Sequence, residues 1–310
     1  MKRSPTLLSS GLFLMVALLS LMIGSVALTP VQVLDALVQP RLDAPAAAIV
    51  WELRMPRLLS VCLAGALLGI TAILLGRIER SGVRDPGWSG VLALGALGAV
   101  VLLVVAPTSS GWAIALASSG GCGLGMLILA ATRQRWPQHV TKLGLLIACT
   151  APMLTFALLI GDIRVATWIR WSIGSFEQRD WAMWQQVWPM AALALLALCA
   201  HLMRPRHHPT LWLAALLSAG CATSAAGALG LIGLLAGRFA TRTNLGLAGL
   251  YTLAALHGAA LLLAADLFAR LLSRLLPSLV LVSELPVGVL LIAASSVVGV
   301  RRLASAQPVA

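Results

Sequence analysis

Residues 58–76 read LLSVCLAGALLGITAILLG, a run without a single charged side chain. A helix needs about 20 apolar residues to cross the hydrocarbon core of a bilayer. Runs of similar length recur along the chain, whereas the short alternating segments of a membrane β-barrel are not visible. This stretch therefore predicts one transmembrane α-helix, and its repetition predicts an all-α polytopic membrane protein.

The overall composition agrees with this prediction. Of the 310 residues, 60% are hydrophobic and only 10% are charged, which is outside the range of soluble domains. The net charge of +12 is not accompanied by a nucleic-acid-binding motif, so we attribute it to membrane topology. The five cysteines all fall within apolar runs without a Cys-x-x-Cys pair, which is typical of small packing residues.

We predict a bundle of about ten transmembrane helices that forms a single transmembrane domain over residues 1–310. The first helix is expected to be retained, because its apolar stretch is long and no convincing small-residue cleavage site follows it. The predicted spans lie near residues 6–28, 58–76, 88–106, 112–131, 143–161, 183–203, 210–229, 248–269 and 284–300, with a shorter partial span at 230–236.

The distribution of Lys and Arg predicts the orientation. With the N-terminus inside, the inner segments hold twelve of the 22 cations and the outer segments hold eight, while Arg238 and Arg242 stay unassigned. Cytoplasmic segments carry the excess of Lys and Arg in membrane proteins. Both termini are therefore expected on the cytoplasmic side.

Glycines recur at close spacing in the predicted helices. Pairs such as Gly65-x-x-x-Gly69 let two helix backbones approach each other closely in lipid. Residues 227–237 contain four glycines, each of which weakens a helix by about 1 kcal/mol relative to Ala. This segment predicts either a broken helix, as transporters use to line their pathway, or a tight helix crossing, and both alternatives stay open.

Three charged residues near span ends suggest structural roles. Asp266 and Arg270 are four residues apart, so they share a helix face and can pair. Pairing lowers the cost of holding both near the membrane, and we prefer it to a proton relay. Glu284 lies two residues before Pro286, which favours capping of the following helix, with docking of a partner as the second interpretation.

Arg54 and Arg57 flank Pro56 at the predicted outer mouth of the second span. By themselves they resemble residues that extend their charged ends to the membrane interface. Two exposed guanidinium groups are also good bidentate partners for the carboxylates of another protein.

Motifs for catalysis are missing from the sequence. The chain has no Walker lysine motif, no nucleophile elbow and no HExxH pair, and its five histidines lack the spacing of metal ligands. We predict no catalytic, cofactor-binding or metal-binding residues, and we do not expect an enzyme. An intramembrane enzyme would need a cluster of polar residues that the spans do not offer.

Several short motifs occur in a fixed order from about residue 11 to 303. They are Arg54-Met55-Pro56-Arg57, Gly65-x-x-x-Gly69, Asp85-Pro86-Gly87-Trp88-Ser89-Gly90, Trp171-Ser172-Ile173-Gly174-Ser175, Gly230-Leu231-Ile232-Gly233-Leu234, Asp266 to Arg270, and Glu284-Leu285-Pro286-Val287-Gly288. In this order and spacing, the chain resembles the FecCD-type permeases of ABC importers for ferric siderophores, haem and vitamin B12.

The resemblance implies a bundle like that of the vitamin B12 importer permease, in the bacterial inner membrane. It implies a second permease subunit, identical or different, a cytoplasmic ABC ATPase that uses the ATP, and a periplasmic substrate-binding protein. The ligand would pass along the subunit interface by alternating access, with no cofactor bound directly. Arg54 and Arg57 would dock the binding protein; Arg77, Arg80, Arg84, Asp85, Arg204 and Arg206 would lie in loops that face the ATPase; and Gly230, Gly233, Asp266, Arg270, Glu284, Pro286 and Gly288 would be structural or line the pathway.

The chain departs from the family pattern mainly on the inner side. Residues 81–84 replace the family's Asn-Pro-Leu-Ala, and residues 204–209 stand where the family carries a short helix that docks on the ATPase. Two prolines in these six residues disfavour a helix. We expect either the diverged half of a heterodimer or a permease that no longer uses ATP productively. An ATPase-independent carrier or a structural partner on the same scaffold is the alternative.

Overall fold

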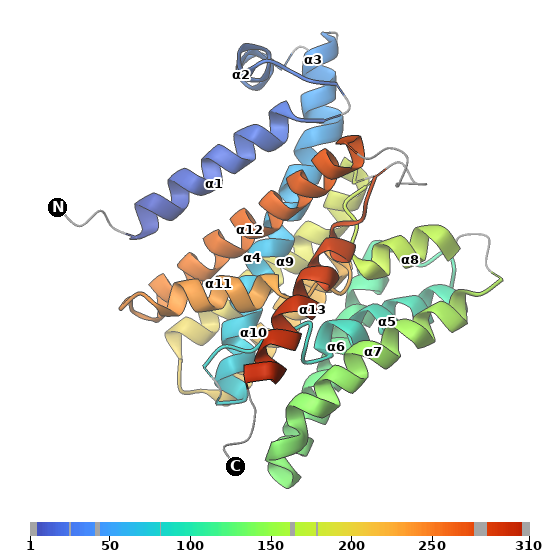
Figure 1. Cartoon of the computed structure of the whole chain (residues 1–310), viewed down its shortest axis with the longest axis vertical. Coiled ribbons are helices and arrows are strands. Elements are labelled where there is room, and N and C mark those ends of the chain that lie inside the picture. Colours follow the sequence, from blue (N-terminus) through green and yellow to red (C-terminus); the bar gives the residue numbers. More distant parts are fainter. Residues whose placement is uncertain are drawn as a thin grey trace.

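The computed structural model describes residues 5–24, 26–40, 44–80, 82–161, 165–177, 179–275 and 284–305, and these form a helical bundle (Figure 1). The helices are α1 (Pro5–Met22), α2 (Pro30–Val38), α3 (Pro45–Ala48), a π-helical turn (Ile49–Arg54), α4 (Met55–Ile78), α5 (Val91–Val105), α6 (Gly111–Arg135), a 3₁₀ turn (Pro137–His139), α7 (Val140–Leu159), α8 (Val165–Ile173), α9 (Trp181–Met203), α10 (His208–Ala226), α11 (Ile232–Thr241), α12 (Leu247–Leu275) and α13 (Val287–Ser305).

The predicted spans correspond to helices of the structure. Within the described residues, six helices are long and apolar enough to cross a membrane. Four shorter apolar helices, which belong to α1, α5, α11 and α13, account for the remaining predicted spans. The all-α polytopic prediction is therefore confirmed. The partial span at 230–236 is α11, which continues to Thr241.

Helix α4 packs against α12, α10 and α11 (Figure 1). Together with α3 and the π-helical turn it forms one continuous helical stretch, Pro45–Ile78. A Cβ added at Gly65 would collide with the carbonyl oxygen of Gly258, and one at Gly69 would collide with that of Ala254. The Gly65-x-x-x-Gly69 motif thus brings the backbones of α4 and α12 into direct contact, because small residues permit such close packing.

A second group of helices contains α5, α6 and α7, which lie with α8 on one side of the bundle in Figure 1, while α1, α11 and α12 lie on the other. Glycines again set the spacing, since a Cβ at Gly121 would collide with the carbonyl oxygen of Leu94 and one at Gly98 would come within 2.6 Å of that of Ala117. Helix α13 runs between the two groups in this view.

The glycine-rich segment is a broken helix. Helix α10 closes with a hydrogen bond from Gly227 N to Thr223 O, and Gly227 then adopts a φ of +77°. Leu231 also has a positive φ, of 72°, immediately before α11 begins. A non-glycine residue with such a φ is uncommon and marks a constrained turn. The tight crossing is present as well, because a Cβ at Gly233 would approach Leu68 O to 2.8 Å.

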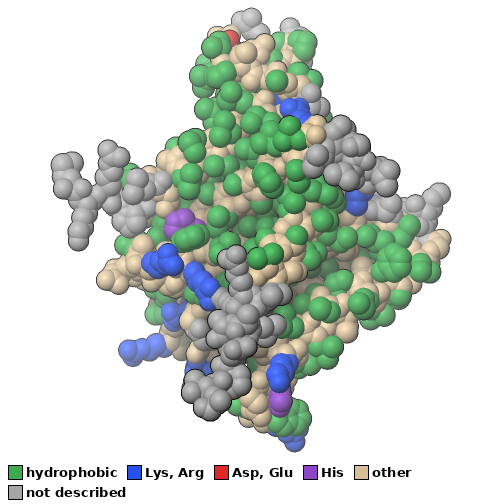
Figure 2. All heavy atoms as spheres, in the orientation of Figure 1, with side chains coloured by type: hydrophobic (Ala, Val, Ile, Leu, Met, Phe, Trp, Pro, Cys, Tyr) green, Lys and Arg blue, Asp and Glu red, His purple; other side chains and the backbone are tan. Residues whose placement is uncertain are grey.

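Two helices expose large apolar side chains. On α7, Met153, Leu154 and Phe156 have 70%, 50% and 51% of their surface exposed, and on α13 Ile292 and Val297 are each 55% exposed. Figure 2 shows that hydrophobic side chains cover the middle of the visible face, while Lys and Arg gather mainly toward its lower end. Apolar surface of this extent suits contact with lipid or with another membrane subunit.

Candidate functional site

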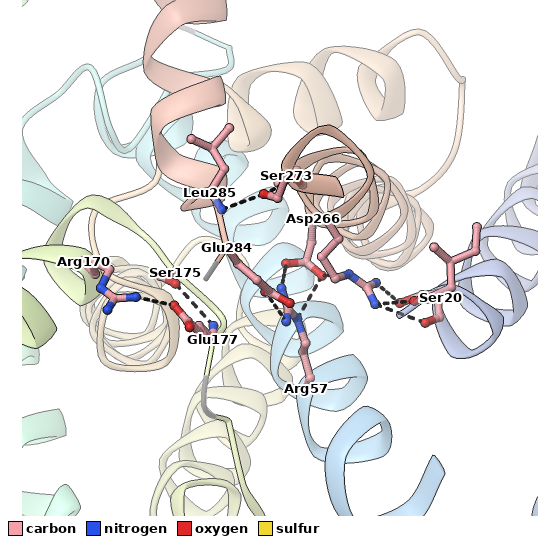
Figure 3. A network of polar contacts seen from close by, with 12 residues as sticks. Ser20, Arg57, Arg170, Ser175, Glu177, Asp266, Ser273, Glu284 and Leu285 are labelled. Atoms are coloured by element: carbon pink, nitrogen blue, oxygen red, sulfur yellow. Dashed lines mark hydrogen bonds and ion pairs between the residues drawn. The ribbon is translucent and has the colours of Figure 1, made fainter. Parts of the chain in front are cut away.

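A cluster of ion pairs joins α4, α12 and the start of α13 (Figure 3). Arg57 Nη1 lies 2.6 Å from Glu284 Oε2, and Arg57 Nη2 lies 2.8 Å from Asp266 Oδ1. Asp266 Oδ2 is 3.2 Å from Arg270 Nε, so the expected pair between Asp266 and Arg270 is present. We call Arg57, Asp266, Arg270 and Glu284 the outer cluster. The carboxylate of Asp266 thus contacts two guanidinium groups, and Glu284 supplies the second negative charge of the cluster.

Arg270 also connects the outer cluster to the end of α1. Its Nη1 donates to Ile23 O at 2.8 Å and to Ser20 O at 3.3 Å, and its Nη2 donates to Ser20 Oγ. The last carbonyl groups of a helix have no partner within that helix. Because Arg270 lies on α12, its hydrogen bonds satisfy these carbonyl groups and attach the end of α1 to α12.

Arg54 is not exposed, and this part of the expectation for the two arginines is wrong. Its exposed fraction is only 8%, and it donates to the carbonyl oxygens of Leu21 and Val26. The segment after α1 folds over the entry to α4 and offers these carbonyls, which a sequence pattern cannot reveal. The side chain of Arg57 is 17% exposed and already bound to two carboxylates. Docking of a binding protein at these arginines stays a prediction.

Glu284, for which we expected a helix-capping role, binds Arg57 on another helix. Its side chain is 32% exposed, which makes it the most accessible carboxylate of the outer cluster. Next to it, Leu285 N donates to Ser273 Oγ at 2.8 Å. The start of α13 is thereby attached to α4 through Glu284 and to α12 through Leu285.

Arg179 is a buried cation near the outer cluster that the sequence did not reveal. Its Nη2 donates to Ser175 O at 3.2 Å, and its Nη1 contacts Met183 Sδ at 3.5 Å. Burial lowers the pKa of Arg179 to about 10, the charge of Arg57 acts in the same direction, and Asp180 opposes both. Nothing in the local pattern marks Arg179, because an arginine in an aromatic-rich loop is usually interfacial.

Three of the sequence motifs meet at the end of α8. Gly288 N donates to Gly174 O at 2.9 Å, and Ala228 N donates to Ser172 O at 3.1 Å. A Cβ at Gly288 would overlap with Ile173 O. Residues 171–175 therefore hold both the break between α10 and α11 and the first turn of α13.

The Asp85 side chain is turned into the bundle and is not on the inner surface; that its loop faces an ATPase stays a prediction. Arg84 N donates to Ala72 O at 3.0 Å, and Asp85 is only 2% exposed. Asp85 Oδ2 accepts hydrogen bonds from Leu231 N at 3.0 Å and from Trp88 N at 3.4 Å. A carboxylate at the start of α11 is favourable, because the N-terminus of a helix carries partial positive charge.

The other residues of the two inner loops lie nearer the surface. Arg77, Arg80, Arg204 and Arg206 are exposed. Arg77 Nη2 and Pro205 O, which are 3.4 Å apart, connect the loops. Helix α9 ends at Met203 and α10 begins at His208, so the predicted absence of a helix from this linker is confirmed.

Arg84 is held between two inner segments. Its Nε lies 3.2 Å from Glu79 Oε2, and its Nη1 donates to Thr141 Oγ1 at 3.1 Å. Burial raises the pKa of the Glu79 carboxyl, while the charges of Arg84 and Arg133 oppose that shift. The positive charge of Arg84 is thus already compensated by Glu79.

A cavity of about 820 Å³ lies beside the Asp85 loop. Helices α5, α7, α8 and α13 and the break between α10 and α11 contribute to its wall, which is mainly apolar. Asp85, Gly230 and Ser295 line it, together with apolar side chains such as Phe156 and Ile292. Several structural motifs of the sequence therefore converge on one chamber.

A bundle of helices long and apolar enough to cross a membrane, with a broken helix beside a cavity, fits the class of polytopic membrane permeases. The family model described as the FecCD transport family matches residues 12–207, which is more than half of the chain. The chain belongs to the FecCD transport family, and it is a permease of the ABC importer class, a transporter component of the membrane.

Curated relatives and a solved structure agree with this assignment. The chain is 29% identical over 271 residues to the vitamin B12 import system permease protein BtuC of Escherichia coli O157:H7, covering 77% of this chain and 78% of that protein. The BtuC protein of Escherichia coli O6:H1 is 29% identical over 275 residues, with the same coverage. A structure described as an inward-facing conformation of a metal-chelate type ABC transporter matches 96% of this chain and 98% of its own, with a TM-score of 0.68 and 20% identity, and so shares the fold.

Proposed function

We propose that this chain is the permease subunit of a binding-protein-dependent ABC importer for a ferric siderophore or a related metal chelate. It would lie in the bacterial inner membrane with both termini in the cytoplasm. The observation that carries the proposal is the 820 Å³ chamber beside the broken helix, in a chain of the FecCD family. A chamber of this size suits a bulky ligand rather than a single ion.

A second permease subunit, identical or different, would cover the apolar faces of α7 and α13. Both helices contribute to the wall of the chamber, and both also expose large side chains such as Met153 and Ile292. Translocation would proceed by alternating access at this interface. An external ATPase would supply the energy, because the sequence contains no nucleotide-binding motif.

The two ends of the bundle would receive different partners. On the inner side, the exposed cations Arg77, Arg80, Arg204 and Arg206 are suited to contact the ATPase. On the outer side, Arg57 would receive carboxylates of the periplasmic binding protein, with Arg54 contributing from a buried position. These roles rest on charge and position.

The first experiment is to isolate the tagged protein from its host in mild detergent and to count its subunits by native mass spectrometry. We expect an ATPase dimer and a second permease subunit. The double variant R204E/R206E should lose the ATPase, because it reverses two exposed cations, while K142E, another exposed inner cation outside these loops, should retain it. Recovery of the wild-type chain without any ATPase would overturn the proposal.

An ATPase-independent carrier is the second candidate, and one observation favours it. The linker between α9 and α10 contains only residues 204–207 and no helix. Uptake that survives deletion of the ATPase but stops when the proton gradient is dissipated would support this alternative. Uptake that stops with loss of the ATPase would exclude it.

A further inference from the structure

Gly230 presents bare backbone to the cavity. A Cβ at this position would lie 3.6 Å from Asp85 Oδ2, 3.8 Å from Ser295 Oγ and 3.8 Å from Trp88 Cδ1, with no closer atom among the described residues. On its other side Gly230 packs tightly, since a Cβ at Gly87 would come within 2.5 Å of Gly230 Cα. Gly230 therefore borders a small space between the Asp85 carboxylate and the Ser295 hydroxyl, which we call the Gly230 space.

Asp85 and Ser295, which border this space, each have one oxygen without a partner among the described residues, although the Asp85 oxygen nearest Gly230 is the bonded Oδ2. Asp85 Oδ2 accepts from Leu231 N and Trp88 N, but Asp85 Oδ1 has no hydrogen bond to any described residue. Ser295 Oγ is likewise buried and without a partner in the described part of the chain. Burying such atoms unsatisfied is costly, so most buried polar groups in proteins are paired.

The local structure explains only part of this arrangement. Stabilising the start of α11 requires a single oxygen of Asp85, which is Oδ2. The neighbouring hydroxyl of Ser296 donates to Ile292 O at 3.0 Å, four residues back, as a helical serine commonly does. Ser295 lacks that bond, and its hydroxyl borders the Gly230 space together with the carboxylate.

We infer that a hydrogen-bond donor group of the transported chelate, such as an amide or an ammonium, is received at Gly230 between the Asp85 carboxylate and the Ser295 hydroxyl. This inference rests on the proposed function and adds a subsite to it. An ionised carboxylate can only accept hydrogen bonds, so the ligand group must donate. A ligand carboxylate has no proton to donate to Asp85. The wall of the cavity also carries the cations Arg84 and Arg238, and its apolar side chains contact the body of the ligand.

The test uses strains whose chromosomal copy carries single substitutions, so that the whole transporter is present. Uptake of four labelled probes is measured per amount of protein in the membrane. Cyanocobalamin and ferrioxamine B carry N–H donors, whereas haemin and ferric dicitrate present ionised carboxylates. We expect the wild type to import a donor-bearing probe.

The key variant is Gly230→Ala, because its methyl group fills the space at ordinary contact distances without a backbone clash. It should lower uptake about tenfold, as loss of a charge-assisted hydrogen bond does. Asp85→Asn should have a similar effect, and Ser295→Ala a smaller one that Ser295→Thr restores. Gly120→Ala, which has open space around it, is the matched control and should import normally.

The following outcomes would contradict either the subsite or the proposed function. Normal uptake by Gly230→Ala, or import confined to haemin and ferric dicitrate, overturns the subsite while the importer stands. If Gly230→Ala fails to accumulate in the membrane, equal uptake by Ser295→Ala and wild type still overturns it. Failure of the wild type to import any probe, together with recovery of the chain without an ATPase, counts against the proposed function itself.

Discussion

Buried polar groups are largely paired in the outer cluster but partly unpaired at the Gly230 space, among the described residues. In the outer cluster, Asp266 uses both of its oxygens and Arg57 binds two carboxylates. Beside Gly230, Asp85 uses one oxygen, while its other oxygen and the hydroxyl of Ser295 have no partner in the described part of the chain. The charged groups of the outer cluster are paired with one another, whereas the Gly230 space has acceptors without a partner among the described residues.

This difference suggests that the outer cluster stabilises the bundle and that the Gly230 space serves transport. Ion pairs connect α4, α12 and the start of α13, and hydrogen bonds from Arg270 attach the end of α1. Breaking a buried pair is costly. Unmatched acceptors beside a chamber suit a group that enters and leaves. If the comparison holds, substitutions in the outer cluster should act on stability, and those at Gly230 on transport.

The largest effect is expected from Asp266→Ala. Removal of this 1% exposed carboxylate would leave Arg57 and Arg270 close together without their shared counter-charge. Breaking a buried ion pair by removing one partner costs roughly 3–5 kcal/mol. Unfolding of the purified protein in detergent, followed by helical circular dichroism, measures this loss.

Asp35→Ala is the matched control for that measurement. Asp35 is exposed on α2, so its removal should change stability little. Equal stability of the Asp266 and Asp35 variants would show that the outer cluster does not hold the helices together.

A second, smaller effect is expected from Gly288→Ala at the contact between α8 and α13. The added methyl group would overlap with Ile173 O, and the adjacent bond from Gly288 N to Gly174 O would lengthen. Overpacking of this kind costs typically 1–3 kcal/mol. The same unfolding measurement applies, with Gly120→Ala as the control because nothing lies near its added carbon. No difference between the two would mean that α13 can shift freely at its first turn.

Most of the fold could be predicted from the sequence. Hydropathy located the apolar helices, because a membrane helix must satisfy its own backbone and exposes apolar side chains along its whole length. The four glycines of residues 227–237 signalled a break, although they could not exclude a simple crossing. The spacing of Asp266 and Arg270 indicated their pairing, since a four-residue separation places both on one helix face.

The environment of individual charges was less predictable. Arg54 and Arg204 were both expected at the surface, yet Arg54 is buried under the segment after α1 and Arg204 is exposed. Asp85 is predicted in a loop that faces the ATPase, but its side chain is buried in the bundle, where Arg84 N donates to Ala72 O. Such placements depend on contacts between distant parts of the chain, which no local pattern encodes.

The smallest effect is expected from Glu284→Gln, at the accessible edge of the outer cluster. The Glu284 side chain is 32% exposed and that of Arg57 is 17% exposed, so solvent screens part of the attraction between them. Exposed or partly exposed pairs contribute about 0–1 kcal/mol, and the amide oxygen of Gln can still accept from Arg57. We therefore expect a loss well below that of Asp266→Ala, and one that shrinks as salt is raised. Glu52→Gln, at an exposed position before α4, controls for the charge change.

A loss from Glu284→Gln as large as that from Asp266→Ala would contradict the ranking of the two carboxylates. It would mean that the attachment of α13 to α4, rather than the buried centre of the cluster, sets the stability of the bundle. A small loss leaves Asp266 as the centre and Glu284 as a contact that can open without unfolding the rest. A binding protein whose carboxylates reach Arg57 would then displace Glu284 at little cost, which makes the start of α13 the first element expected to move.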